Sequence, residues 1–234
     1  MRKMVPGSIA AVLVLTAGCG SATTSKKPVA HETAADTGMT GARLRSALLT
    51  AYGTLTPTAD PQLGTYGALP ITPTSLDMRD IPAGVRIEPG QCRDALWNGP
   101  DLRSFKTAST AFVQFGDPRA VQKGGGVYAW DILLAAGGQP ASAALGRPSA
   151  ACTQVSATYN GETMRYQELQ APKIGLASRA GRLTSSNAKN PAPWIVTYTG
   201  HGYVGMVVLE GPATQDQLNE FATQAYQKAE RTLG

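Results

Sequence analysis

The C-terminal part of the chain constrains the fold most. Residues 203–209 are apolar on both faces of an extended backbone, which suits a strand at the centre of a sheet. Thr214 and Gln217 then fit a capping box, a start signal for a helix. One apolar stripe follows on this helix, formed by Leu218, Phe221, Ala222, Ala225, Tyr226, Ala229 and Leu233. We predict a central strand and a long amphipathic C-terminal helix that docks on the sheet.

Five more segments have the composition of strands. Residues 127–135 alternate most clearly, with aromatic and aliphatic side chains on one face and Asp131 on the other. The other four span residues 107–115, 162–169, 176–184 and 194–199. Only Gly200–Gly202 separates the last of them from the central strand, which indicates a hairpin. The pattern predicts an α+β fold with a sheet of five to six strands and packed helices.

Shorter helices are expected at Thr40–Tyr52, Pro89–Trp97 and Pro140–Leu145. Between the first two, residues 54–90 carry prolines at positions 57, 61, 70, 73, 82 and 89. Repeated proline forbids a long helix and disfavours a central strand. We interpret this segment as an extended arm draped over the domain; a lid over a binding site is the alternative.

The N-terminal residues have the pattern of an export signal. Arg2 and Lys3 precede an apolar run that is too short to span a bilayer, which takes about 20 residues. Residues Leu15–Cys19 resemble the lipobox of bacterial lipoproteins, although Thr16 stands where that family usually has Leu. The resemblance implies that residues 1–18 are a signal peptide. It also implies that Cys19 is acylated, by chains such as palmitate, and anchors the protein to the extracytoplasmic face of the cell membrane. The alternative is an ordinary secretory signal with an incidental cysteine.

After the signal peptide, residues 19–38 are predicted to form the acylated cysteine and a flexible tether. Residues 39–234 are predicted to form a single domain. The tether has too few apolar side chains to offset the entropy of ordering it. Without the signal peptide the net charge falls from +5 to +3, because Arg2 and Lys3 leave with it. Such a small charge does not indicate nucleic acid as a partner. The Ala-, Gly-, Thr- and Pro-rich composition indicates a GC-rich source, such as an actinobacterium.

Two cysteines remain after acylation of Cys19, namely Cys92 and Cys152. Outside the cytoplasm, an even pair predicts a disulfide. The alternative is two unpaired, buried thiols.

Residues for catalysis or metal binding are scarce in the predicted domain. Its one histidine, His201, falls in a hairpin turn, and no nucleophile motif accompanies it. One histidine and two bridged cysteines are too few for a usual zinc site. We expect no catalytic residues, no metal and no cofactor; a hydrolase that uses His201 is the least favoured alternative.

Two features suggest binding. Aromatic residues on the predicted strands and beside Cys92 are candidates to line a cleft. They are Trp97, Tyr128, Trp130, Tyr166, Trp194 and Tyr198. Packing in the core is the simpler interpretation of these residues. Four basic residues and no acidic residue lie between Leu169 and Leu209, namely Lys173, Arg179, Arg182 and Lys189. They are candidates for a patch that binds lipid headgroups or acidic glycans. An ordinary solvated surface is the simpler interpretation of this second group.

The order of elements around the two cysteines resembles a known family. The matching stretches are GQCRDAL around Cys92, SAACTQV around Cys152 and the C-terminal sequence from Tyr203. They are similar to the extracellular sensor domains of mycobacterial serine/threonine kinases and to stand-alone lipoproteins that share this domain. The resemblance implies a twisted antiparallel sheet with packed helices, a cleft for a ligand, and no catalysis. This chain departs from the family in lacking a second disulfide pair and in having Ala151 where Trp is frequent.

Together these features predict a membrane-anchored, non-enzymatic binding module. Its ligand would be a small amphiphile, a lipid or another cell-envelope component. The alternative is an envelope scaffold or regulatory protein that acts through contacts with a protein partner.

Overall fold

A computed structural model of the chain describes residues 39–65, 84–95, 108–137, 141, 145, 150–187 and 192–234. All of them belong to one compact unit, Glu32–Gly234. The predicted signal peptide, Cys19 and the predicted tether lie outside the described residues. Among the described helices, none is long and apolar enough to cross a membrane.

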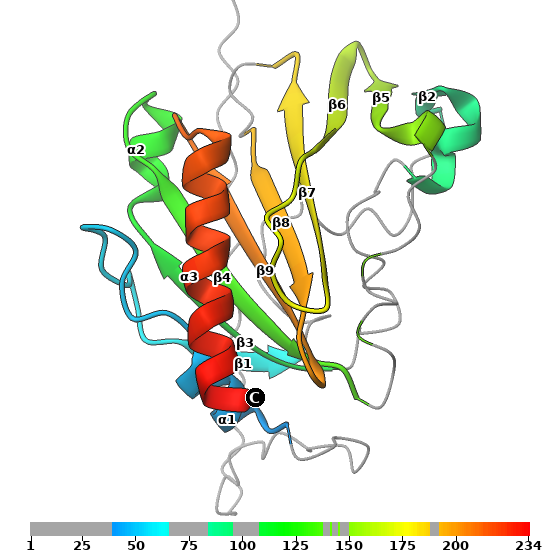
Figure 1. Cartoon of the computed structure of the whole chain (residues 1–234). Coiled ribbons are helices and arrows are strands. Elements are labelled where there is room, and N and C mark those ends of the chain that lie inside the picture. The colour runs from blue at the N-terminus through cyan, green and yellow to red at the C-terminus, as the bar shows by residue number, and fades with distance from the viewer. Residues whose placement is uncertain are drawn as a thin grey trace, which may run out of the picture. The chain divides into compact units, whose positions relative to one another are not determined.

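The described chain is built on one antiparallel sheet (Figure 1). Its strands are β1 (Gln62–Thr65), β2 (Arg86–Glu88), β3 (Ser109–Phe115), β4 (Tyr128–Ala135), β5 (Gln154–Tyr159), β6 (Glu162–Leu169), β7 (Ala177–Ser185), β8 (Trp194–Thr199) and β9 (Tyr203–Glu210). Their order across the sheet is β1-β3-β4-β9-β8-β7-β6-β5-β2. The α+β class is confirmed, but the predicted number of five to six strands is wrong, because the sheet has nine.

The α-helices of the described residues are α1 (Gly41–Ala47), α2 (Pro118–Gln122) and α3 (Gln215–Leu233). Two short 3-10 helices, η2 (Gly90–Ala95) and η5 (Ala150–Cys152), carry the cysteines. The helix predicted over residues 40–52 is shorter, because Leu48 already has an extended backbone. The helix predicted at Pro140–Leu145 lies largely outside the described residues.

One face of the sheet is covered by α1 and α3 (Figure 1). The capping box of Thr214 and Gln217 begins α3 as predicted. Most of the predicted stripe on α3 is fully buried, including Phe221, and packs on strands β8 and β9. Tyr52, which follows α1 in the sequence, packs on this side too: the centre of its ring lies 4.2 Å from that of Phe221. The prediction that the C-terminal helix docks on the sheet is therefore confirmed.

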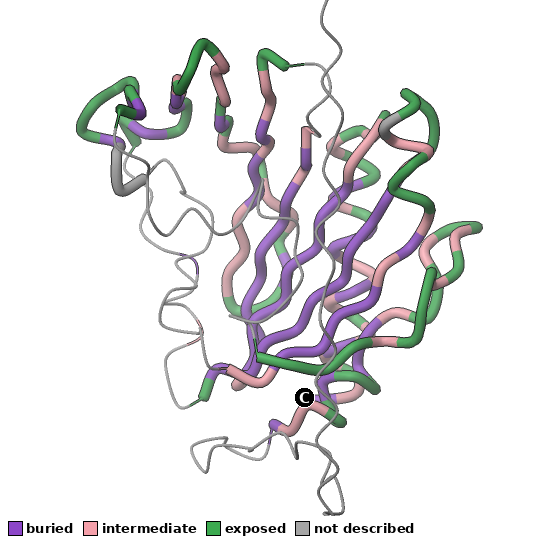
Figure 2. Tube along the Cα trace, turned by 180° about the vertical axis from the view of Figure 1, so that it is seen from behind, coloured by how far each residue is buried: buried purple, intermediate pink, exposed green. Residues whose placement is uncertain are grey.

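The opposite face of the sheet forms a second core, which we call the aromatic face. Alternation along each strand sends every second side chain to this side. Figure 2, seen from this side, shows the central strands as a continuous buried band. The buried residues of the aromatic face are Phe112, Tyr128, Trp130, Ile132, Leu134, Ala136, Tyr166, Leu183, Ile195, Val204, Met206 and Val208. Among the described α-helices, only α2 contributes to it, through Val121.

Two stretches of the proline-rich segment form the edges of the described sheet, and the interpretation of residues 54–90 as an arm draped over the domain stays a prediction. Its strand β1 pairs only with β3, and its strand β2 pairs only with β5. Edge strands tolerate neighbouring prolines, because one side of the strand needs no donors. Residues 66–83 between these strands lie outside the described part of the chain.

The predicted disulfide between Cys92 and Cys152 is confirmed, with its sulfur atoms 2.07 Å apart. It joins η2 to η5 beside the β2 edge of the sheet. A small core surrounds the bridge, formed by Val85, Ile87, Val155 and Ala157. Because the bridge is buried in apolar side chains, it acts as a structural link at this edge.

Candidate functional site

Stacked and edge-on rings organise the apolar part of the aromatic face. The ring of Trp130 lies 5.9 Å from that of Phe112 in a stacked arrangement and 5.6 Å from that of Tyr128 edge-on. Trp130 and Tyr128 both come from β4, and Phe112 comes from the neighbouring strand β3. The three rings are 2% to 6% exposed, so they form a buried apolar layer; aromatic layers of this kind also line small-molecule sites.

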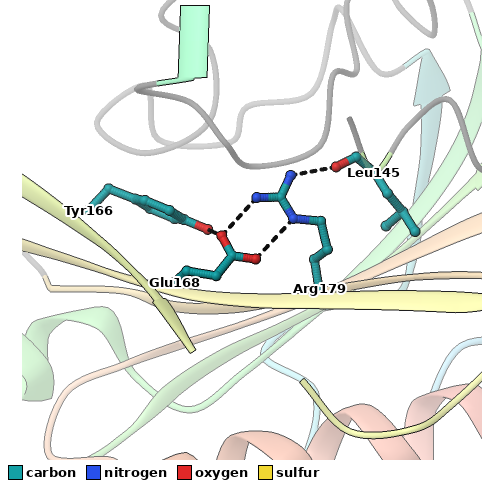
Figure 3. Close-up of polar contacts among 4 residues, drawn as sticks. All are labelled: Leu145, Tyr166, Glu168 and Arg179. Carbon is teal, nitrogen blue, oxygen red and sulfur yellow. Dashed lines mark hydrogen bonds and ion pairs between the residues drawn. The ribbon is translucent and has the colours of Figure 1, made fainter. Parts of the chain in front are cut away.

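A charged network lies at the β6–β7 side of the same face (Figure 3). The Arg179 guanidinium donates from Nε and Nη2 to the two carboxylate oxygens of Glu168, at 3.0 and 2.7 Å. The Tyr166 hydroxyl donates to Oε2 of Glu168 at 2.5 Å, and Arg179 Nη1 donates to the Leu145 carbonyl at 2.5 Å. The side chains of Arg179 and Glu168 are only 11% and 18% exposed. A two-pronged pair of this kind fixes both side chains when it is partly buried.

Gly181 explains why Tyr166 reaches this carboxylate. Gly181 lies directly opposite Glu168 in the β6–β7 pairing. A Cβ atom at Gly181 would collide with the ring of Tyr166, so glycine allows that ring to lie across β7. Burial, and then the neighbouring Glu168, raise the pKa of Tyr166 above its usual value. Tyr166 therefore stays protonated and acts as a donor.

Thr197 is the one buried hydroxyl of this face that is left without a hydrogen-bond partner in the described residues. It is 1% exposed and lies on β8 directly between Arg179 of β7 and Met206 of β9. Thr199, two residues along the same strand, instead donates to the Ala177 carbonyl at 3.4 Å. An unpaired buried hydroxyl is costly and uncommon in folded proteins, so Thr197 marks this position as unusual.

The structure brings together only some of the residues predicted for binding. Tyr128, Trp130, Tyr166 and Arg179 share the aromatic face or its edge. Tyr198 and Trp194 instead pack on the face covered by α3. The predicted aromatic residues therefore do not line one common cleft, because alternation along β8 sends two of them to the other side. The binding role of those on the aromatic face stays a prediction.

The predicted basic patch is also divided. Arg182 alternates with Arg179 along β7, so the two side chains leave opposite faces. The Arg182 guanidinium stacks 4.2 Å from the centre of the Trp194 ring, while Arg179 is paired with Glu168. Lys173 is exposed in the loop before β7. Arg179 and Arg182 thus do not form a single patch. Trp97 and Lys189 lie outside the described residues.

Sequence reasoning missed Glu168, Thr197 and the Leu145 carbonyl as parts of the site. Glu168 and Arg179 are eleven residues apart and meet only through the pairing of β6 with β7. No local sequence motif predicts that pairing.

His201 lies in the β8–β9 turn, as predicted, with its side chain 73% exposed. Its Nδ1 is 3.9 Å from Oε1 of Glu230 on α3. In the described part of the chain, no serine hydroxyl is hydrogen-bonded to it, and no three His, Cys, Asp or Glu side chains are grouped as metal ligands.

Two solved mycobacterial structures resemble this chain. One is the X-ray structure of an uncharacterised protein of Mycobacterium smegmatis, an Rv0999 ortholog. It has a TM-score of 0.55 and 14% identity, over 81% of this chain and 94% of that chain. This chain shares its fold. The other is the extracellular domain of PknH from Mycobacterium tuberculosis, with a TM-score of 0.45 and 14% identity over 82% of this chain and 96% of that one.

The second of these is an extracellular kinase domain of the kind that the sequence resembles. At 14% identity, the match to the M. smegmatis protein establishes the fold and not a function. No protein-family model and no curated protein matches the chain.

Proposed function

We propose that this chain is a non-enzymatic, sensor-like module that binds a small amphiphile, a lipid or another envelope component outside the cytoplasm. The aromatic face carries this proposal. It combines a buried apolar layer, centred on Trp130, with one polar cluster around Glu168 and Arg179. Small-molecule sites have the same composition, in which apolar side chains supply area and a few fixed polar groups orient the ligand.

One feature of the sequence and one of the structure support this location. The lipobox-like residues Leu15–Cys19 indicate a lipid anchor on the extracytoplasmic face of the cell membrane. The disulfide between Cys92 and Cys152 suits an oxidising compartment, because such bonds are rare in the cytoplasm.

Binding is favoured over catalysis by the surroundings of the titratable side chains. Arg179 and Glu168 are held in a mutual ion pair, and His201 projects into solvent beside Glu230.

A scaffold for a protein partner is the weaker alternative. The exposed large apolar side chains among the described residues are Leu63, Tyr159 and Leu176. They belong to β1, to the end of β5 and to the loop before β7, so they come from three separate elements. Protein-binding surfaces usually gather apolar side chains into one patch.

Native mass spectrometry tests the proposal. The full-length gene is expressed in an actinobacterial host, and the protein is measured in native and in denatured form. We expect an adduct that disappears on denaturation and that Trp130→Leu weakens, while the control Trp194→Leu on the other face keeps it. A clean native mass, or an adduct retained equally by both variants, would contradict the proposal.

A further inference from the structure

We propose that a second site lies on the side of the sheet that carries α3, over strands β5 to β7 and the first residue of β8, and that it binds an acidic glycan. Among the described helices, α3 packs on β8 and β9, and α1 packs on β1, β3 and β4 (Figure 1). The side chains that define this area, which we call the polar face, are Ser156, Arg165, Gln167, Arg182, Thr184 and Trp194. The aromatic face lies on the opposite side of the same sheet, so the two sites are independent.

Side chains alternate clearly along β6 and β7. Towards the aromatic face, Tyr166 and Leu183 are buried. Towards the polar face, Arg165 and Gln167 are exposed, and Arg182 is partly exposed. These strands therefore have one side in the core and one side in contact with solvent, as antiparallel sheets commonly do. A ligand can reach the polar face without any rearrangement of the core.

The polar face carries positive charge that its own acidic residues do not neutralise. Arg182 lies opposite Gln167 in the β6–β7 pairing, and Arg165 is two residues from Gln167. The two arginines are therefore diagonal neighbours about 7–8 Å apart. In the described part of the chain neither of them is in an ion pair, and Glu88, which faces the same side from β2, is paired with Arg86. Two unpaired like charges at this distance repel, and an anion bound between them would remove the repulsion.

The guanidinium of Arg182 is fixed in position but has no hydrogen-bond partner. It stacks 4.2 Å from the centre of the Trp194 ring, and this contact orients its plane. Among the described residues the guanidinium makes no hydrogen bond, and its Nε is buried without one. A group that is already fixed loses little entropy when it binds a carboxylate, and guanidinium–carboxylate hydrogen bonds are among the strong ones.

The other side chains of the polar face favour a glycan over a membrane surface. Ser156, Gln167 and Thr184 surround the two arginines with hydroxyl and amide groups, which can donate to and accept from sugar hydroxyls. Insertion into lipid requires an exposed apolar side chain. The ring of Trp194 does not supply one, because it packs against the core under α3 and is stacked by Arg182. A sugar chain with carboxylates complements the polar face in both charge and hydrogen bonding.

An oligogalacturonate, which is a sugar chain with one carboxylate on each unit, is the probe that tests the inference. The full-length protein is titrated by calorimetry with this probe and with a neutral maltooligosaccharide of the same length. We expect only the oligogalacturonate to bind, with an affinity that falls as the salt concentration rises. Arg165→Gln changes an exposed residue and should weaken binding about tenfold, as expected for a lost hydrogen bond to a charged group. The matched control Arg119→Gln, at an exposed arginine of α2, should keep the wild-type affinity.

Arg182→Gln should weaken binding as Arg165→Gln does. If the loss of the stack on Trp194 unfolds the Arg182 variant, the comparison of Arg165→Gln with Arg119→Gln still decides the inference. Equal binding of the neutral chain, an equal loss in Arg119→Gln, or no binding of the oligogalacturonate would overturn it. Binding to phosphatidylglycerol vesicles without binding of the oligogalacturonate would also overturn it and would assign the polar face to a membrane surface. The ligand of the aromatic face is tested separately, by Trp130→Leu.

Discussion

The backbone N–H of Leu49 donates a hydrogen bond of 2.9 Å to Oδ2 of Asp131. This contact ties the residue after the C-cap of α1 to strand β4 inside the sheet. Asp131 is 1% exposed, and its Oδ1 has no hydrogen-bond partner among the described residues. Burial raises the pKa of Asp131 from 3.8 to about 7, against the lowering effect of the Leu49 N–H. Tyr198 is the titratable neighbour from β8, and burial also raises its pKa, so it remains a neutral phenol.

The first prediction concerns pH and stability. Between about pH 4 and about pH 7 the folded protein keeps a proton on Asp131 that the unfolded chain has lost, so stability falls as the pH rises through this window. The loss is on the order of 4 kcal/mol by pH 8. Asp131→Asn removes the charge and keeps an acceptor for Leu49. We expect this variant to gain stability relative to the wild type from pH 4.5 to pH 8, as measured by urea unfolding. If the difference in stability between Asp131→Asn and the wild type stays constant with pH, the raised pKa of Asp131 is contradicted.

The second prediction concerns the ion pair of the candidate site. Glu168→Gln leaves the poorly exposed guanidinium of Arg179 without a counter-charge, so we expect a loss of about 2–4 kcal/mol in the free energy of unfolding. Glu88→Gln is the matched control, because its pair with Arg86 is exposed on the β2 edge, and it should cost less than about 1 kcal/mol. Equal effects of the two variants in urea unfolding would show that the Glu168 pair is no more than a surface contact.

The third prediction uses a glycine in the central strand. A Cβ atom at Gly205 of β9 would collide with the ring of Tyr198, which is fully buried under α3. Overpacking of this kind costs about 1–3 kcal/mol or more, so Gly205→Ala should lower the thermal midpoint clearly. A Cβ atom at Gly64, on the edge strand β1, would have no atom within 4 Å, so Gly64→Ala should change the thermal midpoint little. A neutral Gly205→Ala would mean that Tyr198 has room to move.

The fourth prediction concerns the disulfide. The bridge closes a loop with a sequence separation of 60 residues, so its removal should cost about 4 kcal/mol if the effect is chain entropy. The double variant Cys92→Ala with Cys152→Ala is compared with the oxidised wild type in urea unfolding. The wild type measured in reducing buffer should resemble the double variant. A double variant as stable as the oxidised protein would show that the bridge does not support the β2 edge.

Local patterns predicted the centre of this fold. Alternation from Tyr128 to Leu134 gave the face of β4 correctly, and the capping box at Thr214 gave the start of α3. Both signals depend on neighbouring residues and need no knowledge of distant pairing. Strand β5 was missed although the turn that joins it to β6, Asn160–Gly161, has a strong hairpin sequence with positive φ at both residues.

The edges of the sheet and the candidate site depend on distant partners. The pairing of β1 with β3, and of β2 with β5, joins segments separated by many residues, and proline nearby masks the strand signal. Tyr166 and Arg179 were singled out from the sequence, but for different reasons and without Glu168, which connects them. Strand register brings these three side chains together, and a single sequence does not state that register.

The most direct test of the binding face uses its methionine. Met206 is fully buried in the aromatic face, whereas Met39 is buried on the side of α1 and α3. Methyl groups of methionine are labelled with ¹³C in the full-length protein, which is then titrated with monooleoylglycerol. We predict that the Met206 methyl signal shifts and shows contacts to the acyl chain, while the Met39 signal stays in place. A saturable shift confined to Met39, or no shift at Met206, would contradict a ligand on the aromatic face.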